Sequence, residues 1–213
     1  MARTVYVVDD DAIMRDWLEE TITMLPDVRV EQMTSGHELL AGIDQLEDGV
    51  VLIDLVMPGL SGMETLEKYQ RDVSRFPTIM MSGQADIRDA VSAMRLGAID
   101  FLQKPCTPRD LFDKLRLGFD KVAEQERAAQ ARAQLGDRFA SLSEREKEVL
   151  HLLIEGKVNR EIAAMLDLST RTVEVYRAKL MMKLGVGSLA EAVTMAYSAG
   201  FASAPAGLTR EPV

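Results

Sequence analysis

Several carboxylates stand directly after short apolar runs of this 213-residue chain. Asp9–Asp11 are three consecutive aspartates that follow the run Val5–Val8, and Asp54 follows the run Val50–Ile53. Carboxylates that converge in one crevice repel one another and raise each other's pKa, so such a site needs a cation. Mg²⁺ prefers oxygen ligands and accepts phosphoryl oxygens while it keeps several waters. These residues therefore predict a Mg²⁺ site.

Ser82 and Lys104 extend the predicted site. Ser82 follows the apolar run Thr78–Met81, and Lys104 lies just beyond the weaker run Ile99–Leu102. They supply a hydroxyl and an ammonium group that can hold phosphoryl oxygens. A carboxylate beside a cation can act as a nucleophile, because the cation offsets the developing negative charge. We therefore predict phosphoryl transfer to a carboxylate, with Asp54 as the nucleophile.

The segments that carry these residues alternate between two patterns. Apolar runs rich in Val and Ile alternate with segments of helical periodicity, which predicts a parallel sheet covered by helices on both faces. In a doubly wound sheet the ligand site lies outside the carboxyl ends of the strands. We therefore expect residues 1–122 to form a flavodoxin-like α/β domain. Its five expected strands are Val5–Val8, Val28–Met33, Val50–Ile53, Thr78–Met81 and Ile99–Leu102.

Four motifs of this segment occur in the order of a known family. They are Val7–Asp10, Asp54–Gly59, Ser82–Gly83 and Asp100–Pro105. Through them the segment resembles the receiver domain of bacterial two-component response regulators. The resemblance implies that a sensor histidine kinase donates a phosphoryl group to Asp54. It also implies that Asp10, Asp54 and the backbone carbonyl of Val56 ligate Mg²⁺, while Asp9 acts through a water molecule.

The resemblance assigns further residues to a switch and to a dimer face. Ser82 would swing towards the phosphoryl group, Phe101 would change rotamer with it, and Lys104 would pair with the modified carboxylate. Such domains usually dimerise through the face formed by the fourth helix, fifth strand and fifth helix. The candidates on that face are Ala90, Val91, Met94 and Leu111.

Residues 123–137 have the composition of a helical linker. They are strong helix formers, and Gly136 is expected to end the helix. Because helical spacing extends upstream, one helix is expected from about Pro108 to Leu135, although Gly118 inside it costs about 1 kcal/mol relative to alanine. The residues fit a dimer-forming signalling helix and a solvated spacer equally well.

Residues 138–201 have the pattern of an all-α domain. Ser143 and Glu146 form a capping box at a helix start. A second helix starts near Asn159 and a third after Ser169, and two helices joined by a tight turn make a helix-turn-helix. The buried stripe of the third helix is Val173, Tyr176, Leu180 and Leu184. Residues 202–213 are predicted to be a disordered tail.

The face of the third helix opposite that stripe fits the major groove of DNA. A recognition helix places Arg, Glu and small apolar side chains at base edges there. Flanking polar and basic side chains suit phosphates, which set affinity and register. The outward face consists of Arg171, Glu174, Val175, Ala178 and Met182. The flanking residues are Arg160, Thr170, Thr172, Arg177, Lys179 and Lys183.

Motifs in this part resemble the LuxR-type DNA-binding domain. They are Leu142–Glu146, Asn159–Ala163, Ser169–Lys179 and Lys183–Val186. A receiver followed by this domain is similar to FixJ-like regulators. The resemblance implies a transcription regulator that forms a homodimer when phosphorylated and binds double-stranded promoter DNA. Its last helix, about Leu189 to Tyr197, would mediate dimerisation on DNA, and RNA polymerase is a further candidate partner.

The charge of the chain is unevenly distributed. A net charge of -9 argues at first sight against nucleic acid. Residues 1–122 carry 13 basic and 22 acidic side chains, so the whole excess lies there. By contrast, residues 157–183 carry six Lys and Arg against three Asp and Glu. The two halves are therefore expected to have different partners.

Composition also predicts where the protein works. The single cysteine, Cys106, cannot form an intramolecular disulfide. No apolar run approaches the roughly 18 residues that span a bilayer, and the first residues lack the pattern of a cleavable signal peptide. We therefore expect a cytoplasmic protein with no membrane partner.

Two alternatives accompany this interpretation. A phosphatase with an aspartyl-phosphate intermediate often carries a second aspartate two residues after the nucleophile, and Val56 occupies that position here. The residues therefore disfavour an enzyme of this class. The other alternative is a transcription regulator controlled through its linker or a partner, independently of phosphate.

Overall fold

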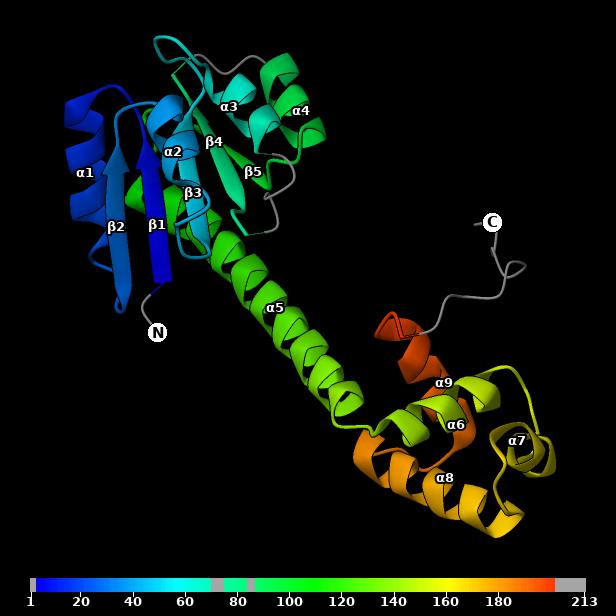
Figure 1. Ribbon diagram of the computed structural model, residues 1–213. Coiled ribbons are helices and arrows are strands. Elements are labelled where there is room, and N and C mark those ends of the chain that lie inside the picture. The colour runs from blue at the N-terminus through cyan, green and yellow to red at the C-terminus, as the bar shows by residue number, and fades with distance from the viewer. Residues whose placement is uncertain (1–2, 70–74, 84–86, 202–213) are drawn as a thin grey trace. The chain divides into compact units, whose positions relative to one another are not determined.

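The computed structural model describes residues 3–69, 75–83 and 87–201 (Figure 1). The chain divides into two compact units, Met1–Arg127 and Ala128–Val213. The expected disordered tail, residues 202–213, lies outside the described residues. Among the residues that are described, no helix is both long and apolar enough to cross a membrane.

The first unit contains the expected sheet of five parallel strands, in the order β2-β1-β3-β4-β5. The second and third strands in chain order lie on either side of β1, so the chain reverses its direction of winding there. The edge next to this reversal is where ligands bind in doubly wound sheets. The strands are β1 (Arg3–Val8), β2 (Val28–Met33), β3 (Gly49–Asp54), β4 (Thr78–Ser82) and β5 (Asp100–Gln103).

Helices cover both faces of this sheet, as Figure 1 shows. They are α1 (Ala12–Ile22), α2 (Gly36–Gly42), α3 (Gly62–Lys68), α4 (Ile87–Arg95) and α5 (Pro108–Ala140). Alternate strand residues point to opposite faces. Val5 and Val7 therefore join a core with α1 and α5, and Tyr6 and Val8 join a second core with α2, α3 and α4. The flavodoxin-like fold expected from the sequence is confirmed.

Helix α5 differs from its expected form at one of its two glycines. It continues through Gly136 and ends only at Ala140, so the expected stop at Gly136 is wrong. Gly136 is exposed, and open space surrounds it where a side chain would begin. The helix runs unbroken through Gly118, as expected. It lies so close to β3 at this point that a Cβ on residue 118 would be 2.7 Å from Val50 Cγ2. Tertiary packing thus explains why residue 118 is a glycine, whereas Gly136 is simply tolerated within the helix.

In the described part of the second unit, up to residue 201, four further helices surround a core of their own. They are α6 (Glu144–Ile154), α7 (Asn159–Leu166), α8 (Thr170–Leu184) and α9 (Leu189–Ser198). Asp167 at φ 55° turns the chain between α7 and α8, and the Ser169 side chain caps α8 by accepting from the Thr172 backbone N–H. Val173, Leu180 and Leu184 are fully buried, and Tyr176 packs against the same core. The expected helix-turn-helix is therefore present.

The two glycines of α5 generate a stability prediction. Gly118→Ala should lower the free energy of unfolding by about 1 kcal/mol, because overpacking against Val50 exceeds the gain in helix propensity. Gly136→Ala, the matched control, should raise it by about 1 kcal/mol. Calorimetric unfolding of the full chain measures both effects. Equal stabilisation by the two substitutions would contradict the close packing of α5 on β3.

Candidate functional site

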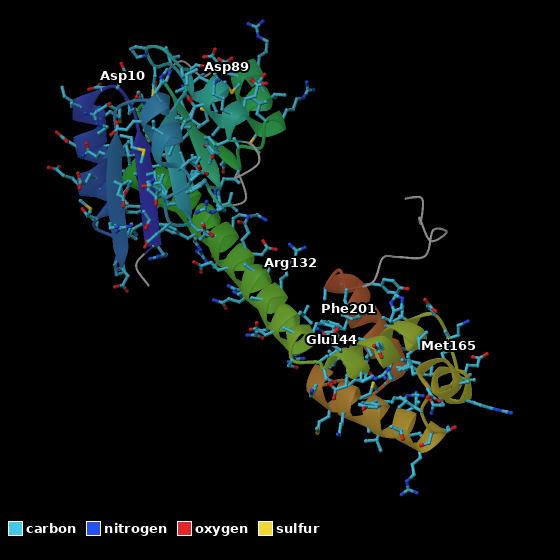
Figure 2. All side chains as sticks on the ribbon, viewed as in Figure 1. Asp10, Asp89, Arg132, Glu144, Met165 and Phe201 are labelled. Atoms are coloured by element: carbon cyan, nitrogen blue, oxygen red, sulfur yellow. The ribbon has the colours of Figure 1, made fainter. Side chains whose placement is uncertain are left out.

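Three carboxylates converge at the carboxyl ends of β1 and β3. Asp9 and Asp10 follow β1, and Asp54 is the last residue of β3. Each offers one oxygen, and these oxygens lie within 4.8 Å of one another. Asp9 and Asp54 are buried whereas Asp10 is exposed, and Figure 2 shows Asp10 near the end of the first strand. The expected convergence is confirmed for these three residues.

Asp11, the third aspartate of the run, caps helix α1. Its Oδ1 accepts a hydrogen bond from the Ile13 backbone N–H at 2.9 Å, which makes it the N-cap of α1. Its own backbone N–H donates to Asp9 Oδ1 at 3.0 Å. Asp11 therefore starts the helix and orients Asp9, and it is not among the three carboxylates that converge.

Lys104 bridges the two buried carboxylates. Its Nζ lies 2.6 Å from Asp9 Oδ2 and 2.6 Å from Asp54 Oδ1. The other oxygen of Asp54, Oδ2, accepts from the Val56 backbone N–H at 3.1 Å. Charge-assisted hydrogen bonds of this length are strong and directional, so Lys104 holds the ends of β1, β3 and β5 together at the site.

Burial and pairing act in opposite directions on these groups. Burial raises the pKa of Asp54 above its ordinary value, although the hydrogen bond from Lys104 lowers it in part. Burial lowers the pKa of Lys104, but its hydrogen bonds to Asp54 and Asp9 outweigh this effect, and its pKa is raised. The Lys104 ammonium therefore keeps its proton, and the Asp54 carboxylate carries an incompletely compensated negative charge.

The remaining expected residues of this site lie around the three carboxylates. Ser82 ends β4 and is buried, and its carbonyl accepts from the Lys104 backbone N–H at 2.7 Å. Phe101, on β5, is half-buried and packs against the core shared with α2, α3 and α4. Val56 is 73% exposed, so its side chain does not cover Asp54.

Arg15 is a residue that the sequence pattern did not indicate. Its NH1 donates to the Asp9 backbone carbonyl at 2.7 Å, and its Nε donates to Gln32 Oε1 at 3.2 Å. The guanidinium thus fixes the backbone of the aspartate pair from α1. Its spacing, one helical turn after the N-cap Asp11, is the signal that would have indicated it.

Helix α8 presents the outward face expected of a recognition helix. Five residues on it are exposed: Arg171, Glu174, Val175, Ala178 and Met182. Of the flanking residues, Arg160, Thr170 and Lys179 are exposed, and Thr172 is half-buried. Arg177 donates to Asn159 Oδ1 at 3.3 Å, which links α8 to the start of α7. Lys183 is exposed as well and lies one helical turn after Lys179 on α8.

Lys183 is exposed but makes two contacts within the second unit. Its Nζ lies 2.6 Å from Glu146 Oε2 and donates to the Ser141 carbonyl at 2.9 Å. The Glu146 side chain is 4% exposed. The ammonium is thus paired with a carboxylate while its side chain stays 35% exposed, and the expectation that Lys183 contacts phosphate stays a prediction.

The expected dimer face needs one correction. Leu111 is fully buried in the core beneath α5 and cannot belong to a surface. Val91 and Met94 are 45% and 49% exposed on α4, and Ala90 is half-buried. Ile87, 82% exposed at the start of the same helix, was missed because residues 84–86 before it carry no clear pattern.

Comparison with known families identifies the class of the protein. Residues 5–116 match the response regulator receiver domain, and residues 140–196 match the bacterial regulatory proteins of the luxR family. The chain therefore belongs to the two-component response regulators that combine a receiver with a LuxR-family domain, and it is a transcriptional response regulator.

Its relatives include the FixJ proteins. It is 40% identical over 200 residues to the transcriptional regulatory protein FixJ of Azorhizobium caulinodans, covering 94% of each chain. It is also 40% identical over 200 residues to FixJ of Bradyrhizobium diazoefficiens, covering 92% of this chain and 95% of that one. Among solved structures, the response regulator StyR matches with a TM-score of 0.76 at 34% identity, covering 93% of this chain and 100% of that one. Full-length FixJ from B. japonicum matches with a TM-score of 0.55 at 39% identity, covering 94% of this chain and 98% of that one.

The raised pKa of Asp54 predicts how Asp54→Asn changes stability with pH. Because the folded protein binds this proton more tightly than the unfolded chain, the group's contribution to stability grows as pH falls from neutral through the folded pKa. Asparagine does not titrate. Asp54→Asn should therefore stabilise the protein at pH 7, and this gain should shrink as the solution is acidified.

Urea unfolding between pH 7 and pH 4 without divalent cations measures this difference. The exposed Asp44→Asn serves as the control and should show little effect. A stability gain from Asp54→Asn that stays constant or grows towards low pH would contradict the conclusion that burial raises the pKa of Asp54.

Proposed function

We propose that Asp54 accepts a phosphoryl group from a sensor histidine kinase, and that the phosphorylated chain dimerises and binds promoter DNA. The observation that carries this proposal is the convergence of Asp9, Asp10 and Asp54, two of which, Asp9 and Asp54, also contact the Lys104 ammonium. In the transfer, a carboxylate oxygen of Asp54 forms the new P–O bond. The P–N bond of the kinase phosphohistidine breaks, and the imidazole nitrogen takes up a proton.

The donor set fits Mg²⁺. All three side chains offer carboxylate oxygens, and their closeness suits a single hard cation. Asp10, Asp54 and the Val56 carbonyl would hold the ion directly, and Asp9 would do so through water. When bound, Mg²⁺ neutralises charge on the phosphoryl oxygens. Lys104 contributes a second positive charge, and its contact with Asp54 would pass to a phosphoryl oxygen after transfer.

Two residues near the acceptor are proposed to relay its modification. Ser82 would bind a phosphoryl oxygen through its hydroxyl, and Phe101 would change rotamer on β5. Phe101 is half-buried and packs against the core shared with α2, α3 and α4. The dimer face would then form around α4, where Ile87, Val91 and Met94 expose apolar surface. Exposed apolar groups on one helix favour association through that helix.

The DNA-binding role is proposed for α8 and its surroundings. Base edges would be contacted by Arg171, Glu174, Val175 and Ala178. Phosphates would be contacted by Arg160, Thr170, Thr172, Arg177 and Lys179. Dimerisation helps because two weak DNA-binding modules that are joined act at a high effective concentration.

The proposed domains are a receiver at residues 1–122, a linker at 123–137 within α5, and a DNA-binding domain at 138–201. The family supports regulation of transcription in the cytoplasm, with RNA polymerase as a further proposed partner. We take Asp54 as a stoichiometric phosphoryl acceptor and not as the nucleophile of a phosphatase, because the exposed Val56 offers no acid or base.

The assignment of the acceptor predicts the outcome of phosphorylation by acetyl phosphate. With Mg²⁺, the wild type and Asp44→Asn should incorporate a phosphoryl group, while Asp54→Asn should show only background. Chelation of the metal should abolish incorporation in all three. Phosphate-affinity electrophoresis measures the modified fraction. Equal modification of Asp54→Asn and wild type would contradict the assignment.

The proposed DNA face predicts the effect of Arg171→Ala. Loss of a base-edge or phosphate contact should weaken binding to a preferred duplex by about tenfold or more. The matched control is Arg145→Ala on α6, where the arginine is exposed and pairs with Glu148. Fluorescence anisotropy with a labelled duplex measures both affinities, and the control should bind within about twofold of wild type. Equal losses in the two variants would contradict the proposed face.

A further inference from the structure

The carboxyl end of the recognition helix α8 is tied to the start of the second unit. Lys183 Nζ reaches Glu146 Oε2 at 2.6 Å and the Ser141 carbonyl at 2.9 Å. One residue further, the Leu184 carbonyl accepts from Arg138 NH1 at 3.0 Å. The last carbonyls of a helix lack partners within it, and cations are favourable there. Both cations thus act at the end of α8 that lies away from its exposed N-terminal turns.

Glu146 is itself rigidly held. Its Oε2 also accepts from the Ser143 backbone N–H at 2.8 Å, and the Ser143 hydroxyl accepts from the Glu146 backbone N–H at 3.3 Å. Burial raises its pKa, but the hydrogen bonds from Lys183 and Ser143 outweigh burial, and the pKa is lowered. The buried carboxylate is therefore ionised at neutral pH and needs a cation beside it.

We propose that Lys183 and Glu146 are positioning residues for DNA binding: their ion pair fixes the angle at which α8 leaves the core, and Lys183 does not contact phosphate. This inference rests on the proposed DNA-binding function of α8. It follows from geometry, because the pair joins the first turn of α6 to the last turn of α8. A small rotation at that end displaces Arg171 and Glu174 at the other end of the helix.

Lys179 provides a matched control on the same helix. It lies one turn before Lys183, is exposed, and makes no ion pair within the part of the chain that the structure describes. An ammonium that neutralises a DNA phosphate releases a counterion, and this makes affinity fall with salt. An ammonium that is already paired with a carboxylate adds nothing to that dependence. The two lysines should therefore differ in how they affect the salt dependence of binding.

The test uses the full chain and a duplex selected by the wild type from a random-sequence library. Affinity is measured by anisotropy over a series of salt concentrations for Lys179→Met, Lys183→Met, Glu146→Gln and Lys183→Arg. Glutamine keeps an oxygen for the Ser143 N–H, so Glu146→Gln removes the ion pair but retains the cap. Circular dichroism at the assay temperature verifies that each variant is folded.

We expect Lys179→Met to reduce the slope of log affinity against log salt by about one. Lys183→Met and Glu146→Gln should each weaken binding by roughly tenfold and leave the slope unchanged. Lys183→Arg, which keeps the ion pair, should bind within about twofold of wild type.

Two results would overturn the proposal. If Lys183 contacts phosphate, Lys183→Met reduces the slope as Lys179→Met does. Glu146→Gln then binds as tightly as the wild type or more tightly, because it frees the ammonium. If the wild type selects no sequence, or Lys179→Met leaves the slope unchanged, the proposed DNA face of α8 is wrong, and this inference fails with it.

Discussion

The contact of the Lys104 ammonium with Asp9 and Asp54 is the interaction on which the receiver site depends. Two buried carboxylates that approach each other this closely would repel strongly without a cation between them. Lys104 comes from the end of β5, whereas the carboxylates come from the ends of β1 and β3. The strand order is therefore what makes the contact possible, and the contact in turn stabilises the edge of the sheet where the chain's winding reverses.

A similar constraint governs the second unit at smaller scale. The buried Glu146 carboxylate requires Lys183, and the pair connects the capping box of α6 to the recognition helix. In each unit one lysine contacts a buried carboxylate, or two in the case of Lys104, and so connects the ends of separate elements. The contact of Lys104 lies where phosphoryl chemistry is proposed, and that of Lys183 lies at the end of α8 away from Arg171.

Much of this architecture could be predicted from sequence because the signals are local. The apolar runs before Asp9 and Asp54 predicted the strands whose ends carry these residues. Ser143 and Ser169 predicted helix starts. The errors concern tertiary contacts. Gly136 looked like a helix stop, but α5 continues to Ala140, and Leu111 looked like a surface residue until the helix was placed on the sheet. The sequence pattern also did not indicate the backbone N–H from which Asp11 accepts or the carboxylate that pairs with Lys183.

The uneven distribution of charge along the chain corresponds to the two proposed sites. The acidic excess of residues 1–122 belongs to the unit whose carboxylates fit Mg²⁺ and a phosphoryl group. In the second unit one of the basic residues, Lys183, is paired with the buried Glu146 carboxylate, so fewer unpaired charges are available than composition suggests. Weak, salt-sensitive binding by a single unit follows, which makes dependence on a dimer physically reasonable.

The central claim is that Asp54 is the phosphoryl acceptor. Borohydride reduces an aspartyl phosphate to homoserine, so reduction after treatment with acetyl phosphate and Mg²⁺ marks the modified residue permanently. Peptide mass spectrometry then locates it. We predict homoserine at residue 54 and at neither Asp9 nor Asp10. Homoserine at one of those two positions, or its absence from a chain shown to be phosphorylated, would contradict the claim.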